Sequence, residues 1–163
     1  MVDLEELQRR LGVSLQESRF RHNRRFDVAS ESVFGLLRLL SCEHGFNMLV
    51  DITAVDYLEY PAAVDRFRVI YQLLNVDSGE RLVVRTPLNP PDLQLSSVVS
   101  LWSGANWLER EVYDMFGIVF TGHPDLRRIL MPDEFTEYPL RKDYPVKGRG
   151  ERHNFPVITR AES

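Results

Sequence analysis

Cysteine is nearly absent from the sequence, since Cys42 is the single one among 163 residues. One thiol cannot form an internal disulfide, and it cannot supply the ligands of a four-cysteine iron–sulfur cluster or of a structural zinc site. The composition therefore predicts a reducing compartment. It also predicts that any electron transfer in which the chain takes part runs through other proteins.

Long apolar runs are absent as well. No stretch approaches the roughly 18 consecutive apolar residues that a membrane-spanning helix needs. The first residues, Met-Val-Asp-Leu-Glu-Glu, are acidic and lack the pattern of a signal peptide. No glycine-rich phosphate loop occurs either, so we expect no nucleotide site. Any contact with a membrane is expected to be made through a partner.

Basic residues do not predominate. The 24 acidic residues outnumber the 20 lysines and arginines, which gives a net charge of −4. A nucleic-acid-binding domain is usually basic, so this balance argues against bulk binding of nucleic acid. The hydrophobic share of 44% is ordinary for a globular protein, and a chain of this length can bury a core of its own.

Hydrophobic periodicity and turn residues predict strands clustered in the middle of the chain, with helices on either side. This order favours the α+β class, with a mainly antiparallel sheet and flanking helices in a domain over residues 1–120. The expected strands cover residues 21–28, 46–55, 66–76 and 81–86. The expected helices cover residues 3–11, a segment from Ser30 to just before Gly45, a region that begins near Leu95, and a segment from Ser103 or Gly104 to Phe116.

The last part of the chain has a different composition. Residues 139–160 contain six basic and two acidic residues, and such a segment cannot bury enough apolar surface to order itself alone. Prolines recur through it and disfavour helix. Residues 121–163 are therefore predicted to form an extended arm that lies against a partner. The prolines are Pro124, Pro132, Pro139, Pro145 and Pro156.

A helix over residues 104–116 would have two faces. Trp107 falls among charged residues on the arc opposite the apolar side. It could lie flat on its own domain while the charges face solvent. We favour a helix that faces a partner, because Trp, Tyr and Arg are enriched at interface hot spots. The side expected to face the core carries Leu108, Val112 and Met115, and the opposite arc carries Arg110, Glu111 and Asp114.

Other interpretations of the charged residues are weaker. Glu111, Asp114 and His123 could hold the metal of a small hydrolase, but their spacing is a poor match to a metal site. The basic pairs Arg127-Arg128 and Arg141-Lys142 could bind phosphate, yet the many nearby acids favour ion pairing. A stand-alone RNA-binding module would use the arginines of residues 19–25 and the C-terminal bases, with a steep dependence of binding on salt.

His123 lies in the turn sequence Gly-His-Pro-Asp. We expect its ring to be exposed and to hold the turn through a hydrogen bond.

Three strings between residues 109 and 145 resemble a known family. E-R-E-V-Y-D-M-F-G-I begins at Glu109, G-H-P-D-L-R-R-I-L begins at Gly122, and P-L-R-K-D-Y-P begins at Pro139. Together they resemble the signature of the C subunit of respiratory complex I, the proton-translocating NADH–quinone oxidoreductase. The resemblance implies an α+β domain followed by an arm. The arm would wrap over the hydrogenase-like D subunit, which helps to form the quinone site and is called the quinone-site subunit below.

The resemblance also implies that this chain has no active centre or cofactor of its own. FMN, iron–sulfur clusters, NADH and quinone would belong to the companion subunits, which couple electron transfer from NADH to ubiquinone or another quinone to proton transport. The chain would be a scaffold among the peripheral-arm subunits, without a nucleic-acid partner. It would lie on the cytoplasmic side of the bacterial inner membrane and reach the membrane only through the complex.

The segment between the second and third strings departs from the common family pattern. It reads M-P-D-E-F-T-E-Y-P from Met131, and Tyr138 stands where a histidine is often found. The Met-Pro start is more similar to the ferredoxin-dependent relative of complex I, and membrane-bound hydrogenases carry a related subunit. Both remain alternatives.

Nine charged or aromatic residues are predicted to contact the partner or to position the arm. They are Trp107, Glu111, Asp114, His123, Arg127, Arg128, Arg141, Lys142 and Asp143.

Overall fold

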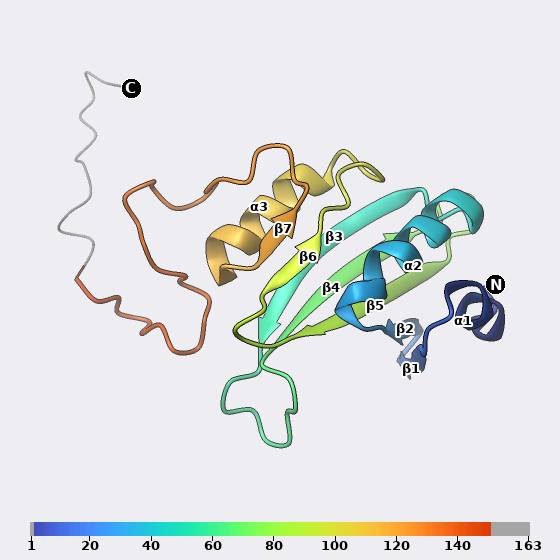
Figure 1. Cartoon of the computed structure of the whole chain (residues 1–163), viewed down its shortest axis with the longest axis horizontal. Coiled ribbons are helices and arrows are strands. Elements are labelled where there is room, and N and C mark those ends of the chain that lie inside the picture. The colour runs from blue at the N-terminus through green and yellow to red at the C-terminus, as the bar shows by residue number, and fades with distance from the viewer. Residues whose placement is uncertain (1, 151–163) are drawn as a thin grey trace.

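The computed structural model describes residues 2–150 and consists of a five-stranded sheet with helices on one of its faces (Figure 1). The strand order is β1-β2-β5-β4-β3, and every pairing is antiparallel except that of β2 with β5. The expected α+β class with a mainly antiparallel sheet is confirmed. The strands are β1 (Gln16–Phe20), β2 (Asn23–Asp27), β3 (Met48–Asp56), β4 (Phe67–Leu74) and β5 (Arg81–Leu88).

Side chains that alternate along the central strands form the sheet's core face. On β4, Phe67, Val69, Tyr71 and Leu73 are all buried, as their spacing predicts, while the residues between them are only half-buried. One face of the sheet is therefore buried, whereas the other is half-buried. The turn from β4 into β5 is built around Asn75, whose Oδ1 accepts the backbone N–H groups of residues 77 and 78, both at 3.0 Å.

Helices α1 (Leu4–Leu11) and α2 (Ser30–Glu43) cover the core face at the β1 side of the sheet, and α3 (Ala105–Phe116) packs against β3 at the other edge (Figure 1). α2 buries an apolar stripe that includes Val33, Leu36, Leu37 and Leu40, as predicted. Its N-cap is Ala29, so Ser30 is the first helical residue and not the predicted cap.

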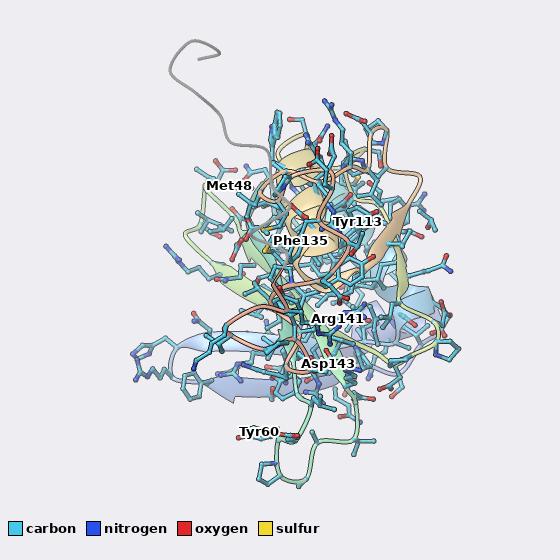
Figure 2. The ribbon with its side chains drawn as sticks, turned by 90° about the vertical axis from the view of Figure 1, so that its left-hand side faces the viewer. Met48, Tyr60, Tyr113, Phe135, Arg141 and Asp143 are labelled. Atoms are coloured by element: carbon cyan, nitrogen blue, oxygen red, sulfur yellow. The ribbon has the colours of Figure 1, made fainter. Side chains whose placement is uncertain are left out.

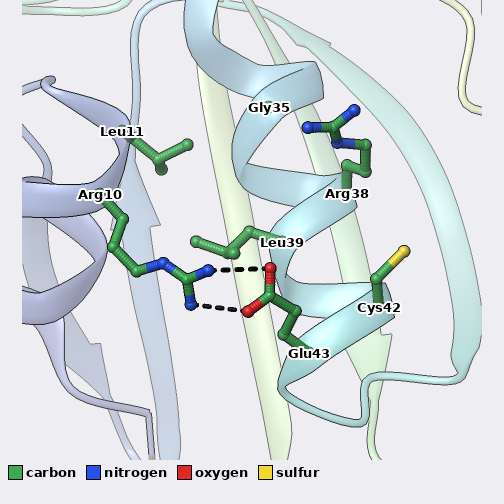
Figure 3. Close-up of a pocket in the computed structure, with 7 residues that line it drawn as sticks. All are labelled: Arg10, Leu11, Gly35, Arg38, Leu39, Cys42 and Glu43. Carbon is green, nitrogen blue, oxygen red and sulfur yellow. Dashed lines mark hydrogen bonds and ion pairs between the residues drawn. The ribbon is translucent and has the colours of Figure 1, made fainter.

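The hollow between α1 and α2 has a volume of about 440 Å³ and is lined in part by Arg38 and by Cys42, which is exposed (Figure 3). The Arg10 guanidinium in this hollow is paired with Glu43, with Nη1–Oε2 at 2.7 Å and Nη2–Oε1 at 2.9 Å. Because this cation already has its counter-ion, we assign the hollow no binding role.

The strand expected over residues 21–28 is confirmed as β2, which covers residues 23–27. It is the second half of a hairpin, since the chain turns at Arg21 and His22, and the first strand of that hairpin, β1, was not predicted. One expectation about elements is wrong. The helical region expected near Leu95 is instead the short strand β6 (Gln94–Ser96), which pairs in parallel with β7 (Val119–Thr121). That pairing joins segments on either side of α3, so no local pattern reveals it.

After β7 the chain runs past α3 without helix or strand as far as residue 150 (Figure 1). It nevertheless contacts its own domain, because Leu140 donates its N–H to the carbonyl of Met115 at 3.1 Å. The prediction of an arm that orders only against a partner concerned residues 139–160. The part of that segment beyond residue 150 lies outside the described residues.

Candidate partner-binding surface

The structure divides the charged residues of α3 between the interior and the surface. Trp107 and Glu111 are exposed, and Trp107 retains 60% of its accessible area. Arg110 and Asp114 are buried. The prediction that these two residues lie on an outward arc is wrong, because residues 127–131 fold back over this side of the helix and cover them.

Asp114 fixes that covering segment. Its Oδ2 accepts the backbone N–H groups of Ile129, Leu130 and Met131 at 3.0, 2.7 and 2.9 Å, and its Oδ1 lies 2.6 Å from Nη1 of Arg128. Burial raises the pKa of the carboxyl group, but the three N–H groups and the guanidinium outweigh it and hold the pKa of Asp114 below its usual value. This one carboxylate therefore accepts three consecutive backbone N–H groups in a segment that has no helix or strand to pair them.

Arg110 links the same segment to Trp107. Its Nε and Nη2 donate to the backbone carbonyls of Arg127 and Arg128 at 3.2 and 2.9 Å. The guanidinium also lies 5.2 Å from the centre of the Trp107 ring, within the range of a cation–π contact. The exposed indole is thus backed by a buried side chain that cannot readily move.

Two arginines of the arm are held between aromatic rings. Arg128 lies 5.6 Å from the ring of Phe135 and 5.5 Å from that of Tyr138. Arg141 lies 4.4 Å from the ring of Tyr138 and donates its Nε to the carbonyl of Phe116 at 2.6 Å. The ring of Tyr138 thus lies close to both guanidiniums.

Gly117 makes this arrangement possible. It ends α3 with a φ of 73°, and a Cβ placed on it would lie 2.6 Å from both Arg141 Nη2 and the Tyr138 ring. A side chain at this position would therefore meet both a backbone penalty and a steric clash.

The next residues of the arm are attached to the end of the sheet. The backbone N–H of Lys142 donates to Oδ2 of Asp56 at 2.8 Å, and Asp143 Oδ2 lies 2.6 Å from Nη2 of Arg66. The hydrogen bond to Arg66 holds the pKa of Asp143 below its usual value. Figure 2 shows Arg141 and Asp143 between α3, which carries Tyr113, and the loop that carries Tyr60.

His123 holds its turn through its ring, as predicted. Nδ1 accepts the N–H of Asp125 at 3.0 Å, which leaves the proton on Nε2 to be donated to the carbonyl of Asn106 at 3.1 Å. The ring is enclosed, however, and not exposed as expected. Glu109, which was not among the predicted site residues, lies beside it, with Oε2 4.0 Å from Nε2.

Glu109 is completely buried and accepts hydrogen bonds from Ser97 Oγ at 2.7 Å and from the N–H of Val98 at 2.6 Å. Burial raises the pKa of its carboxyl group despite these donors. The first acid of the E-R-E string thus ties α3 to the segment that follows β6. Its position in the sequence, between Leu108 and Arg110, provides no local sign of this burial.

A metal site on Glu111, Asp114 and His123 has no counterpart in the structure. Both oxygens of Asp114 are occupied by residues 128–131, and Glu111 is exposed. Over residues 2–150, no group of three or more His, Cys, Asp or Glu side chains is placed to hold a metal ion.

The exposed residues around these fixed groups form what we call the α3–arm surface. Its apolar members include Trp107 and Leu130, of which Leu130 is 62% exposed. Arg127 contributes an exposed guanidinium, paired with Asp125 at 2.9 Å. We define the α3–arm surface by Trp107, Glu111, Arg127, Leu130 and Leu140.

Of the predicted interface residues, Trp107, Glu111 and Arg127 therefore lie on this surface. Asp114, Arg128 and Arg141 are engaged mainly in fixing the arm from within. The helices among the described residues include none that is long and apolar enough to cross a membrane.

Comparison with known proteins agrees with the resemblance in the motifs. The family model described as "Respiratory-chain NADH dehydrogenase, 30 Kd subunit" matches residues 26–150. The C subunit of the NADH-quinone oxidoreductase of Trichlorobacter lovleyi is 48% identical over 123 residues, which cover 76% of this chain and 75% of that protein.

Two solved structures share the fold. A trypsin-resistant fragment of Nqo5 is 39% identical with a TM-score of 0.66, and the match covers 76% of this chain and 96% of the fragment. A chain of the membrane-bound sulfane sulfur reductase, an archaeal respiratory membrane complex, is 23% identical with a TM-score of 0.74 over 96% of this chain and 91% of that chain.

The fold thus places the chain in the α+β class, with the same fold as the Nqo5 fragment. The chain belongs to the family of the 30 kDa subunit of the respiratory-chain NADH dehydrogenase, whose bacterial members include the C subunit of NADH-quinone oxidoreductase.

Proposed function

We propose that this chain is a non-catalytic subunit of a proton-translocating NADH–quinone oxidoreductase, and that it binds the quinone-site subunit through the α3–arm surface. The observation that carries the proposal is the way Trp107 is presented. The indole is exposed, yet the side chain that packs against it is held in place. Arg110 lies against the ring, and both Arg110 and Asp114 form hydrogen bonds with the backbone of residues 127–131. Rigid, exposed aromatic residues of this kind are typical of interface hot spots.

The motif residues support a bracing role. Their charged side chains form hydrogen bonds with backbone groups of the same chain. Asp114 accepts the N–H groups of residues 129–131, and Arg141 donates to the carbonyl of Phe116 at the end of α3. A surface preorganised in this way can hold a neighbouring subunit to within a fraction of an ångström, which is the precision that a quinone site and its electron donors require. The cofactors FMN, iron–sulfur clusters, NADH and quinone are assigned to the companion subunits.

The family members support NADH, and not ferredoxin, as the electron source of the complex, because the 48% identical relative is named as a subunit of an NADH-quinone oxidoreductase. We place the chain on the cytoplasmic side of the bacterial inner membrane, peripheral and attached through its companions. An RNA-binding role has less support, since Arg24 of the basic hairpin is already bidentate to Glu17, with both N–O distances at 3.0 Å.

Replacing Trp107 with alanine tests the proposal. The full chain is tagged and expressed in its own host in place of the native gene, and the quinone-site subunit recovered with it is measured. Recovery should fall at least about tenfold when the chain carries Trp107→Ala, because truncating a hot-spot aromatic residue costs about 2 kcal/mol or more of binding free energy. Phe20→Ala is a matched control, because Phe20 is also an arginine-backed aromatic, is 55% exposed, and lies on β1 at the opposite edge of the sheet.

The melting temperature of both purified variants should stay close to that of the wild type. Equal recovery of the quinone-site subunit by the Trp107→Ala and wild-type chains would contradict the proposal. So would an equal loss with Phe20→Ala, because the effect would then not be specific to the α3–arm surface.

A further inference from the structure

The loop between β3 and β4, residues 57–66, projects beyond the end of the sheet (Figures 1 and 2). Residues 58–64 are all exposed, and Glu59 is the only charged residue among them. Val64 is 92% exposed and Tyr60 is 65% exposed. We call residues 58–64 the loop tip. Contiguous exposed apolar residues of this kind mark a site of interaction.

The loop tip has a defined shape. Tyr60 donates its N–H to the carbonyl of Tyr57 at 2.9 Å, and Ala63 donates its N–H to the carbonyl of Tyr60 at 3.2 Å. The rings of Tyr57 and Tyr60 meet edge to face, with 5.7 Å between their centres. The loop tip is therefore a preformed apolar projection, which loses little freedom when it binds.

Two residues of the loop tip adopt a backbone conformation that favours glycine. Glu59 has a φ of 65° and Ala62 has a φ of 62°. Residues with a Cβ rarely adopt such angles, and those that do cluster at functional sites. The loop thus combines exposed apolar area with backbone strain, and both features disfavour a purely structural role.

The base of the loop is joined to the arm. Asp56, just before the loop, accepts the N–H of Lys142, and Arg66 at its end pairs with Asp143. The arm in turn leads back to α3 through the hydrogen bond of Leu140. A partner that covers the α3–arm surface is therefore placed to reach the loop tip as well.

We propose that the loop tip inserts into an apolar recess of the companion subunit that binds the α3–arm surface, and this rests on the proposed function. A protein recess fits better than an anionic membrane surface. The loop tip carries no lysine or arginine, and Glu59 would be repelled by anionic headgroups. Beneath the tip, a hollow of about 200 Å³ can receive a side chain of the partner. Tyr57, Tyr60 and Val64 form much of its wall, and the ion pair of Asp65 with Arg68 also lines it.

Site-specific cross-linking tests where the loop tip lies. A photoreactive residue replaces Val64 in the full tagged chain, expressed in its own host, and a second chain carries it at Val76, which is exposed in the β4–β5 turn. After irradiation of the assembled complex, we expect Val64 to be cross-linked to an apolar segment of the quinone-site subunit and Val76 not to be. Cross-links from position 64 only to lipid, only to a second copy of this chain, or to nothing would overturn the proposal.

A pair of variants tests the contribution of the loop tip to assembly. The double variant Tyr60→Ser with Val64→Ser should lower the recovery of the quinone-site subunit at least about tenfold, whereas Val76→Ser should not. The melting temperature of the double variant should match that of the wild type, because both side chains are exposed. Unchanged recovery with the double variant would refute the loop proposal.

The Trp107→Ala chain separates the two proposals. If Trp107→Ala loses the quinone-site subunit and the double variant does not, the α3–arm surface stands and the loop proposal fails. If both variants retain that subunit, both proposals fail. If the double variant alone loses it, the loop tip is the docking site and the α3–arm surface is not.

Discussion

The carboxylate of Asp114 provides the sharpest prediction about how this surface is built. Asp114→Ala removes the acceptor of the N–H groups of Ile129, Leu130 and Met131 and the counter-ion of Arg128. An unsatisfied buried donor costs about 1–3 kcal/mol, and breaking a buried ion pair costs about 3–5 kcal/mol. Because these losses overlap and residues 127–131 can move toward water, we expect a loss of about 3–5 kcal/mol in the free energy of unfolding.

Urea denaturation at pH 7 measures this loss, and amide hydrogen exchange locates it. Exchange should accelerate first at residues 129–131. Asp125→Asn is the matched control, because Asp125 pairs with Arg127 on the exposed surface and should contribute at most about 1 kcal/mol. A loss below about 1 kcal/mol for Asp114→Ala, or exchange at residues 129–131 that does not change, would refute the account of how the covering segment is held.

The dependence on pH follows from the lowered pKa of Asp114. Its folded pKa lies below its unfolded pKa, so its contribution to stability is fully present above the unfolded value of about 4 and is lost as the pH falls through the folded value. The difference in stability between the wild type and Asp114→Ala should therefore shrink in acid. A difference that stays constant down to low pH would show that the interaction is not ionic.

Two further predictions concern Glu109 within α3 and Gly117 at its end. Gly117→Ala should lower the free energy of unfolding by about 2–4 kcal/mol in thermal or urea unfolding, because the new Cβ adds overpacking against Arg141 and Tyr138 to the backbone strain. Gly79→Ala is the control, since Gly79 has a similar φ but open space around it, and it should lose only about 1 kcal/mol. Equal losses for the two variants would rule out the steric contribution at Gly117. Glu109 has a raised folded pKa, so its ionisation makes the wild type less stable as the pH rises above the unfolded value of about 4.3. Glu109→Gln should remove that decline as the pH rises above about 4.3. A variant whose stability falls with rising pH as steeply as that of the wild type would contradict the assignment.

Local patterns were sufficient for the elements whose apolar residues repeat regularly. Leu36, Leu37 and Leu40 of α2 and the alternating residues of β4 are buried where their periodicity places them. Helix α3 ends at Gly117, as predicted. In contrast, β6 and β7 were missed because each has only three residues and is defined by pairing with the other across α3.

The site residues show the same division between local and long-range information. A helical wheel identified the exposed position of Trp107, but it could not anticipate that residues 127–131 return to cover Arg110 and Asp114. Burial of Glu109 likewise depends on donors from residues 97 and 98, which precede the helix. The motifs pointed to the right family, and only the folded chain reveals which charges face inward.

Oxidative footprinting of Trp107 is the most direct measurement of whether the α3–arm surface is a binding surface. The indole should react with hydroxyl radicals in the isolated chain, where it is 60% exposed, and should be strongly protected in the assembled complex. Phe20, at the opposite edge of the sheet, provides the internal comparison. Trp107 that is oxidised equally in the isolated chain and in the complex would contradict the account.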